Sequence, residues 1–316
     1  MEKRKKLPKA LLNRYKLLRR TKSEKVVFTF AFITFFIYAS LIILPIVYLF
    51  IMASFASADA YGDYLYMRTT DPSYTVFSIH LSNNFKNYLY IFKMEISPDG
   101  NTYHLGDMLF NSLWFCVISS AGGVLMSAFT GYVIAKYKFK GRNLIYSIVI
   151  FCMTIPIIGT TGSMLKLVSE GGLNIINTPW FVILTSLGGF GFNFMVLHAF
   201  FKNVSWNYVE AVLIDGGGHF TAFFKVVLPQ ATSSITTLII LALIGTYNDY
   251  TTPILYLRSY PTIASGIYEL SNDLTKCFEP TGTFAVLLVS IVPIVTLFAI
   301  FSDKVMKNFS IGGLKG

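Results

Sequence analysis

The chain has 316 residues, of which 54% are hydrophobic and 13% are charged. Soluble domains carry about 25% charged residues, so this composition excludes an ordinary soluble protein and indicates a membrane protein. The net charge of +10 is unevenly distributed, because 11 of the 26 Lys and Arg residues lie in the first 25 positions, before the first apolar segment. We therefore expect no basic surface on a folded soluble domain and no nucleic-acid partner.

Six apolar segments have about the length that a membrane-spanning helix needs, which is roughly 20 residues for a bilayer core. The sequence therefore predicts an all-α integral membrane protein with six transmembrane helices. In chain order these are expected at Val26–Ser54, Met108–Ala135, Leu144–Leu167, Pro179–Phe201, Ser234–Thr252 and Thr283–Phe301.

The distribution of basic residues predicts the orientation of these helices. With the N-terminus in the cytoplasm, 20 Lys and Arg residues lie inside and 6 lie outside, as the positive-inside rule requires. Six helices then place the C-terminus in the cytoplasm as well. The expected parts are a basic cytoplasmic tail (1–25), the first transmembrane helix (26–54), an extracytoplasmic loop (55–107), a five-helix core (108–302) and a cytoplasmic C-terminal tail (303–316).

The extracytoplasmic loop 55–107 is the longest connection, and acidic residues outnumber basic ones in it. Loops of this length are often functional. The loop is either a docking surface for an external partner or a solvated cap, and the sequence leaves both interpretations open.

A cytoplasmic connection within the core, residues 203–229, is predicted to form two helices separated by a sharp turn. Asn207 precedes Glu210 by three residues, the spacing of a capping box, so the first helix is expected to begin near Asn207. Gly216–Gly218 ends it, because glycine readily adopts positive φ. The second helix carries an apolar stripe of Phe220, Phe223, Phe224 and Val227. Such a unit is either a docking element for a soluble partner or an ordinary amphipathic helix at the membrane surface.

Residues 210–229 read EAVLIDGGGHFTAFFKVVLP and resemble the EAA loop of ABC importer permeases. That motif runs E-A-A, three residues, G, nine residues, I-x-L-P. Here Val212 replaces the second alanine and Val226 replaces the isoleucine. The resemblance implies that a separate ATPase contacts this loop, through Glu210, Ala211, Leu213, Asp215, Gly216, Leu228 and Pro229.

Other segments resemble the carbohydrate branch of the family, the maltose-permease-like type I importers. They are Asn111-Ser112, residues 135–142, Ile214-Asp215-Gly216 and residues 247–250, which read YNDY where the family has W-N-D-F. The C-terminal end is similar to the family ending G-x-x-x-G-x-x-K-G, except that Asn308 stands at the first glycine. The resemblance implies that this tail reaches between the ATPase subunits, through Gly312, Gly313, Lys315 and Gly316.

The family resemblance implies a particular assembly: a second homologous permease, two ATP-binding subunits and an extracytoplasmic solute-binding protein, in the bacterial cell membrane. The chain has no G-x-x-x-x-G-K-[ST] phosphate loop, so ATP and Mg²⁺ are expected on the partner subunits and not on this chain. It is therefore expected to be non-catalytic, with no metal site and no cofactor of its own.

Polar residues within membrane segments tend to face the interior of the protein, so they are candidates for the solute path. These are Asn193, Tyr247, Asn248 and Asp249. The alternative for Asn248 and Asp249 is hydrogen bonding between helices or at a helix end.

The favoured solute is a carbohydrate, an oligosaccharide above all, and an amino-acid or peptide importer is the alternative within the same family. An ion-coupled secondary transporter is disfavoured, because the spans carry almost no charge and the chain does not divide into two similar halves.

Overall fold

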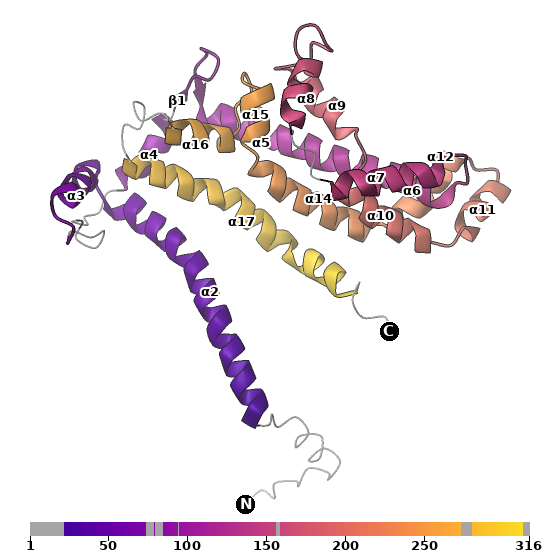
Figure 1. Ribbon diagram of the computed structural model, residues 1–316, viewed down its shortest axis with the longest axis horizontal. Helices are drawn as coiled ribbons and strands as arrows, with labels where there is room; N and C mark the ends of the chain where they lie inside the picture. The colour runs from indigo at the N-terminus through magenta and orange to yellow at the C-terminus, as the bar shows by residue number, and fades with distance from the viewer. Residues whose placement is uncertain are drawn as a thin grey trace, which may run out of the picture.

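The computed structural model describes residues 22–73, 79, 85–93, 95–155, 159–272 and 280–311, and this part of the chain is almost entirely helical (Figure 1). Its elements are α2 (Lys22–Phe55), α3 (Ala58–Thr70), α4 (Lys86–Lys93), β1 (Glu95–Ile96), β2 (Tyr103–His104), α5 (Leu105–Val117), the π-helical turn η2 (Ile118–Gly122), α6 (Gly123–Lys136), α7 (Arg142–Thr154), α8 (Thr160–Val168), α9 (Pro179–Ser186), α10 (Phe192–Asn203), α11 (Asn207–Ile214), α12 (His219–Ala222), η3 (Phe223–Val227), α13 (Leu228–Gln230), α14 (Thr232–Tyr247), α15 (Thr251–Tyr256), α16 (Ile263–Asn272) and α17 (Pro280–Ile311).

Three helices of the described chain are long and apolar enough to cross a bilayer: Ser23–Phe55, Leu105–Lys136 and Thr281–Phe301. The second of these joins α5, η2 and α6 into one continuous rod, named here the Leu105–Lys136 helix. A fourth crossing exists if His219–Gln230 and Thr232–Tyr247, which meet at a bend of 75°, form one span. The expected helices at residues 26–54, 108–135 and 283–301 are therefore confirmed as long apolar helices.

Three expected helices remain. The one expected at residues 234–252 ends early, because α14 stops at Tyr247 and α15 begins at Thr251, and the other two are interrupted. Residues 144–167 divide into α7 and α8, and residues 179–201 divide into α9 and α10. At the second break, Gly189 and Gly191 adopt φ values of +64° and +128°, which L side chains rarely accept. The Thr130 hydroxyl donates a hydrogen bond to the Gly189 carbonyl and holds this break against α6. Hydropathy did not reveal the breaks because the residues on both sides of each are apolar.

The segment expected as a loop, residues 55–107, contains α3, α4 and a small antiparallel hairpin of β1 and β2. The hairpin corrects the prediction of a purely α-helical chain. Residues 98–101 read Pro-Asp-Gly-Asn, a turn-forming sequence, and Gly100 adopts a φ of +90° there. Ile96 anchors the hairpin in an apolar cluster with Met108 and Ala285.

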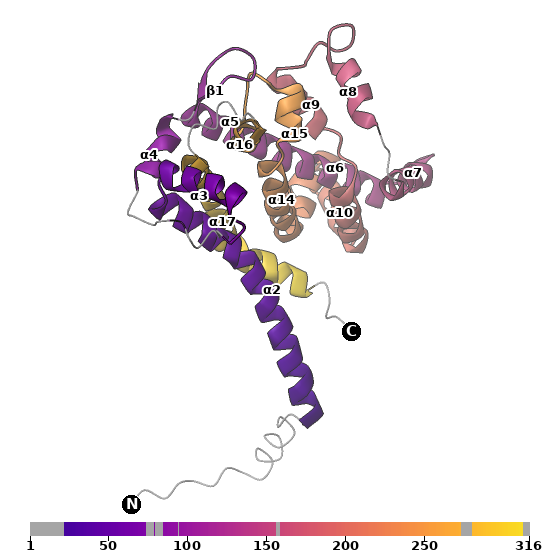
Figure 2. The same ribbon diagram turned by 60° about the vertical axis from the view of Figure 1, so that its left-hand side comes forward.

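Helix α2 leaves the body of the molecule and packs on it toward its C-terminal end, chiefly on α17 and α4 (Figures 1 and 2). Met52, Ala53 and Ser54 are buried there, whereas most apolar side chains before them are exposed. An exposed helix of this composition is compatible with hydrocarbon and not with water, so α2 is a membrane helix.

The central helix pair is α6 and α10, which cross at Gly131. A Cβ atom on Gly131 would lie 3.1 Å from the backbone nitrogen of His198, so a glycine is needed for this approach. Close crossings through small residues are typical of membrane helices. The pair belongs to the largest apolar cluster, which also includes residues of α12, η3 and α14.

Candidate functional site

The first part of the candidate site is α11, which begins at Asn207 as the sequence predicts. The expected capping box is wrong, however. Trp206 occupies the N-cap position without a side-chain cap, and the Asn207 amide donates instead to the Ser205 hydroxyl, with N and Oγ 3.3 Å apart. The Trp206 carbonyl accepts hydrogen bonds from the amides of Val209 and Glu210.

The glycine turn that ends α11 has the geometry of a Schellman motif. The Gly217 amide donates to the Val212 carbonyl over 2.8 Å, and the Gly216 amide donates to the Leu213 carbonyl over 3.2 Å. Gly216 adopts a φ of +81°, the left-handed conformation that this motif needs. Gly217 is crowded, because a Cβ atom there would lie 2.6 Å from Cγ1 of Val212. The first two glycines of Gly216–Gly218 therefore have separate physical reasons to be glycine.

The second helix of the loop runs without a break from His219 to Gln230 through the π-helical turn η3. The apolar stripe predicted for it is divided between two environments: Phe223 and Val227 are buried, whereas Phe220 and Phe224 are exposed. Phe220 stacks on Phe129 of α6, with ring centroids 6.4 Å apart.

The inner side of this loop is part of the protein core. Val209 of α11 is fully buried, and so are Ala222 and Val227 of the second helix. They belong to one apolar cluster with Tyr132 of α6 and Phe201 of α10. A force on α11 is therefore applied to tightly packed helices and not to a loose connection.

The outer side of the loop is open. Its exposed side chains include Glu210, Ala211, Ile214 and Asp215, and Ile214 is 84% exposed. The Glu210 carboxylate makes no hydrogen bond or ion pair within the described part of the chain, so it is available to a partner. Leu213 is half-buried and packs on the core side. We call residues 203–229 the coupling loop from here on, after the role that the sequence leads us to expect for them.

The coupling loop leads directly into the apolar helix α14. Leu228 and Pro229 form the short α13, Ala231 is buried at the bend, and α14 starts at Thr232. Proline fits the start of a helix, where its missing N–H has no partner to lose. Leu228 and Pro229 therefore lie directly before the bend into α14.

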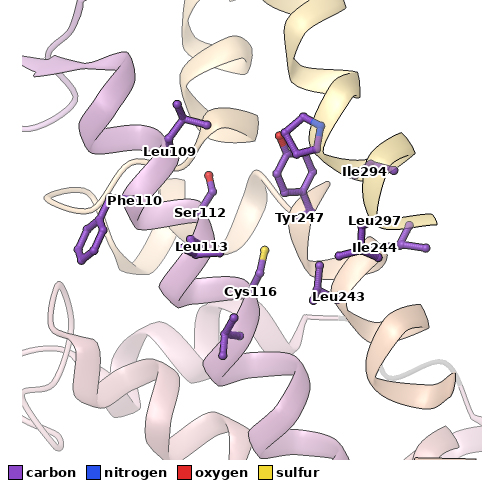
Figure 3. Close-up of a pocket in the computed structure, with 12 residues that line it drawn as sticks. Leu109, Phe110, Ser112, Leu113, Cys116, Leu243, Ile244, Tyr247, Ile294 and Leu297 are labelled. Atoms are coloured by element: carbon purple, nitrogen blue, oxygen red, sulfur yellow. The ribbon is translucent and has the colours of Figure 1, made fainter. Parts of the chain in front are cut away.

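Tyr247 lines a pocket of about 360 Å³ between α5, α14 and α17 (Figure 3). Ser112, Cys116 and Tyr247 face this space, and the remaining lining residues are apolar. The Tyr247 hydroxyl donates to the Ser290 carbonyl over 3.0 Å, and the Ser112 hydroxyl donates to the Met108 carbonyl over 2.8 Å. Because both hydroxyl hydrogens are used within the protein, the pocket presents an aromatic ring and aliphatic side chains.

The other candidate path residues have separate environments. Asn248 is exposed and donates from Nδ2 to the Ile244 carbonyl over 2.8 Å, at the end of α14. Asp249 accepts from the Thr252 amide over 3.0 Å, at the start of α15. Asn193 is half-buried on α10 and is not among the residues that line the pocket of Tyr247. The structure thus gathers Tyr247, Asn248 and Asp249 at one helix break and leaves Asn193 apart.

The C-terminal residues Gly312, Gly313, Lys315 and Gly316 lie outside the described residues, as does the basic tail before residue 22.

Sequence reasoning missed a polar cluster that joins three distant segments. Asn177, in the connection between α8 and α9, bonds with both ends of its side-chain amide to Ser259, whose hydroxyl in turn bonds to Asp99. The only sequence signal is the asparagine itself, a residue that tolerates the positive φ of 59° that it adopts here.

The long apolar helices define a membrane protein. The chain belongs to the family described as binding-protein-dependent transport system inner membrane component, whose model matches residues 123–309. It is accordingly a multi-pass protein of the cell membrane, and its family is that of transporter permease subunits.

Curated relatives carry transport names. The diacetylchitobiose uptake system permease protein NgcG of Streptomyces coelicolor is 26% identical over 66% of this chain and 70% of its own length. The arabinooligosaccharides transport system permease protein AraQ of Halalkalibacterium halodurans is 28% identical over 65% of this chain and 73% of its own length.

Solved structures share the fold. A chain of a bacterial ABC transporter involved in the import of the acidic polysaccharide alginate superimposes with a TM-score of 0.69 at 18% identity, covering 90% of this chain and 98% of that one. A chain of the alginate transporter in complex with a pentasaccharide-bound periplasmic protein gives a TM-score of 0.59 at 15% identity, covering 90% of this chain and 96% of that one.

Proposed function

We propose that this chain is one of two permease subunits of an ATP-driven importer, and that its coupling loop is where an ATPase subunit engages it. The observation that carries this proposal is the two-sided character of the loop. Glu210, Ala211 and Ile214 face outward, while Val209 and Val227 are buried among α6, α10 and α14. A partner that grips the outer side can therefore move the membrane helices through the inner side.

The proposed topology has six spans with both termini in the cytoplasm. Two of the spans are the interrupted pairs α7 with α8 and α9 with α10. The excess of Lys and Arg on the proposed inner side supports this orientation. The proposed parts keep the limits expected from the sequence: 1–25, 26–54, 55–107, 108–302 with the coupling loop 203–229, and 303–316.

The proposed complex contains a second, homologous permease, two ATPase subunits that bind ATP and Mg²⁺, and an extracytoplasmic solute-binding protein. The family description, which names a binding protein, supports the last partner. The resemblance of the C-terminal end supports a contact of Gly312, Gly313, Lys315 and Gly316 with the ATPases. This chain itself carries out no chemical step.

The proposed solute is a carbohydrate, an oligosaccharide above all. The support is that relatives from several bacteria are named as permeases for oligosaccharides such as diacetylchitobiose and arabinooligosaccharides. On the solute path we place Asn193, Tyr247, Asn248 and Asp249. Tyr247 contributes its ring there, since its hydroxyl is engaged with Ser290 and flat aromatic faces suit sugar rings.

The test of the coupling role is a charge reversal on the exposed side of α11, Glu210→Lys, in the complex purified with its natural companions. We expect the variant to reach the membrane, to retain less ATPase and to lose most solute uptake. Glu170→Lys is the matched control, because Glu170 is also exposed but lies beyond α8. Full uptake by a Glu210→Lys complex with its ATPase attached would refute the coupling role.

The solute class is tested separately by uptake into proteoliposomes that contain the whole complex and its binding protein. We expect unlabelled oligosaccharides to compete with transport, whereas dipeptides and amino acids do not. Competition by dipeptides or amino acids alone would assign the chain to the alternative solute class.

A further inference from the structure

The Leu105–Lys136 helix is followed by a tyrosine whose ring contacts one residue before α11 and one residue after the glycine turn that ends it. Tyr137 follows α6 in extended backbone, with φ −92° and ψ 136°. Its ring centroid lies 5.6 Å from that of Trp206 and 5.4 Å from that of His219, with interplanar angles of 89° and 74°. Trp206 is the N-cap residue of α11, and His219 is the first residue after the glycine turn. Edge-to-face pairs of this kind are attractive beyond simple apolar burial.

Hydrogen bonds join the same residues. The Tyr137 hydroxyl lies 3.0 Å from Nδ1 of His219 and 3.3 Å from the hydroxyl of Tyr132. Tyr132 is buried in α6, and its ring lies 4.8 Å from that of Phe223 in the second helix of the coupling loop. The neighbouring Lys136 donates from Nζ to the Val204 carbonyl, just before α11. Residues at the end of α6 thus contact the coupling loop on both sides of α11. The contacts before α11 are at Val204 and Trp206, and the contact after it is at His219.

The contact matters because the turn after α11 is made of glycines. Gly216 and Gly217 are fixed by the Schellman motif, but a displacement of α11 can be absorbed by rotation about Gly218, which is exposed and where a Cβ atom would meet nothing within 4 Å. Tyr137 bridges this turn from outside, since it touches Trp206 before the turn and His219 after it. The bridge makes α11 and the second helix of the coupling loop move as one unit with α6.

The other end of the same helix contacts a different part of the molecule. Asn111 donates from Nδ2 to the Pro261 carbonyl over 3.2 Å, and the Ser112 hydroxyl accepts from the Ile263 amide over 2.8 Å. The Trp114 and Tyr260 rings also meet edge to face, 5.7 Å apart. At about 1.5 Å per residue, the helix between these contacts and Tyr137 measures about 40 Å. One rod therefore links the coupling loop to the connection between α15 and α16.

We propose that Tyr137 is a positioning residue that transmits displacement of α11 to the Leu105–Lys136 helix, and through it to residues 260–263. The proposal rests on the coupling role proposed for α11. Tyr137 acts through Trp206 and His219 and does not itself bind ATP or solute. Its loss leaves the ATPase bound to the exposed side of α11 but lets the glycine turn absorb the motion.

The experiment measures solute transported per ATP hydrolysed by the complete complex in proteoliposomes. Tyr137→Ala is expected to lower this ratio by about 2- to 30-fold, the range by which residues along a coupling route alter it, with the ATPase retained. Tyr137→Phe keeps the ring contacts and is expected to stay within about twofold of the wild type. Such rescue by the conservative variant distinguishes positioning by the ring from a general effect.

Tyr146→Ala is the matched control, because Tyr146 is a half-buried tyrosine of α7 whose ring packs on His198 of α10, 4.6 Å away. We expect it to lower thermal stability without changing the transport ratio. The proposal is overturned if Tyr137→Ala transports as much solute per ATP as the wild type, or if Tyr146→Ala lowers the ratio equally.

A second variant decides the matter if Tyr137→Ala does not assemble. His219 is exposed, so His219→Ala is expected to fold while losing the ring contact and the hydroxyl bond after the glycine turn. A ratio at least twofold below the wild type supports the bridge, and a wild-type ratio overturns it. Failure of the coupling role itself is recognised separately, since Glu210→Lys would then transport normally.

Discussion

The Ser259 hydroxyl donates a hydrogen bond to the Asp99 carboxylate, with 2.6 Å between Oγ and Oδ2, although 160 residues separate the two in the chain. Asp99 also accepts from the Tyr103 hydroxyl over 3.0 Å, within the turn of the hairpin. Asn177 completes the cluster, donating from Nδ2 to Ser259 Oγ over 2.6 Å and accepting from the Ser259 amide over 2.7 Å. The β1–β2 hairpin and the connections after α8 and α15 are therefore held together as one unit.

The first prediction concerns the pH dependence of this cluster. The hydrogen bond from Ser259 lowers the pKa of Asp99 from its ordinary value of 3.8 to about 2. A depressed pKa means that the folded protein favours the charged carboxylate. The stabilising contact is thus fully present above pH 3.8 and is lost as the pH falls through about 2. We expect no change in the cluster between pH 7 and pH 4.

The measurement is an NMR titration of ¹³C-labelled aspartate carboxyl groups in detergent, with the Asp99 signal assigned from its disappearance in Asp99→Asn. Ser259→Ala should raise the midpoint toward 3.8, since it removes the main cause of the shift. An Asp99 midpoint near 3.8 in the unchanged protein would contradict the prediction.

The second prediction separates two neighbouring glycines of the coupling loop. Gly217→Ala places a Cβ atom 2.6 Å from Cγ1 and 2.9 Å from the carbonyl oxygen of Val212, whereas Gly218→Ala meets nothing within 4 Å. Overpacking costs about 1–3 kcal/mol, and an unhindered surface change costs within about 0.5 kcal/mol. We expect Gly217→Ala to lower thermal stability and ATPase retention, with Gly218→Ala as its control. Equal behaviour of the two variants would show that the turn has a different geometry.

The third prediction concerns the crossing of α6 and α10. Gly131→Val brings side-chain atoms against the His198 backbone, which a Cβ atom alone approaches to 3.1 Å, and the backbone cannot rotate away. Gly245→Val is the matched control, because Gly245 also lies in a membrane helix and a Cβ atom there has open space. Thermal unfolding in detergent should show Gly131→Val less stable than Gly245→Val by about 1–3 kcal/mol. Similar melting temperatures would rule out close packing at Gly131.

The long helices could be predicted from the sequence because they depend on local composition. Residues 26–54 and 283–301 are apolar over a bilayer thickness, and the structure places α2 and α17 there. The start of α11 at Asn207 was also predicted, although the capping box on which that prediction depended is not formed. The glycines after α11 also signalled a turn, which the φ of +81° at Gly216 confirms.

Features that depend on tertiary contacts could not be predicted. The break between α9 and α10 is held by Thr130, which lies 59 residues before Gly189. At the start of α11, the Asn207 amide donates to the Ser205 hydroxyl, and the Asn207 side chain does not cap the helix. The bridge of Tyr137 across the coupling loop likewise joins residues 82 positions apart. Hydropathy and helical spacing describe one segment at a time, so contacts between segments leave no trace in them.

The fourth prediction tests whether Tyr247 serves the solute path through its ring. The Tyr247 hydroxyl already donates its hydrogen to the Ser290 carbonyl, so it cannot donate a second hydrogen bond to a sugar. Tyr247→Phe keeps the ring in the pocket of Figure 3 and removes only this link between α14 and α17. Hydrogen bonds between membrane helices average about 0.6 kcal/mol, so we expect a small loss of stability and nearly full uptake. Tyr247→Ala should lower uptake strongly, because both the ring and its packing are lost.

The two variants are compared by initial uptake rates at equal amounts of assembled complex, with melting temperature measured in parallel. A large loss of uptake in Tyr247→Phe with an unchanged melting temperature would instead assign the solute contact to the hydroxyl.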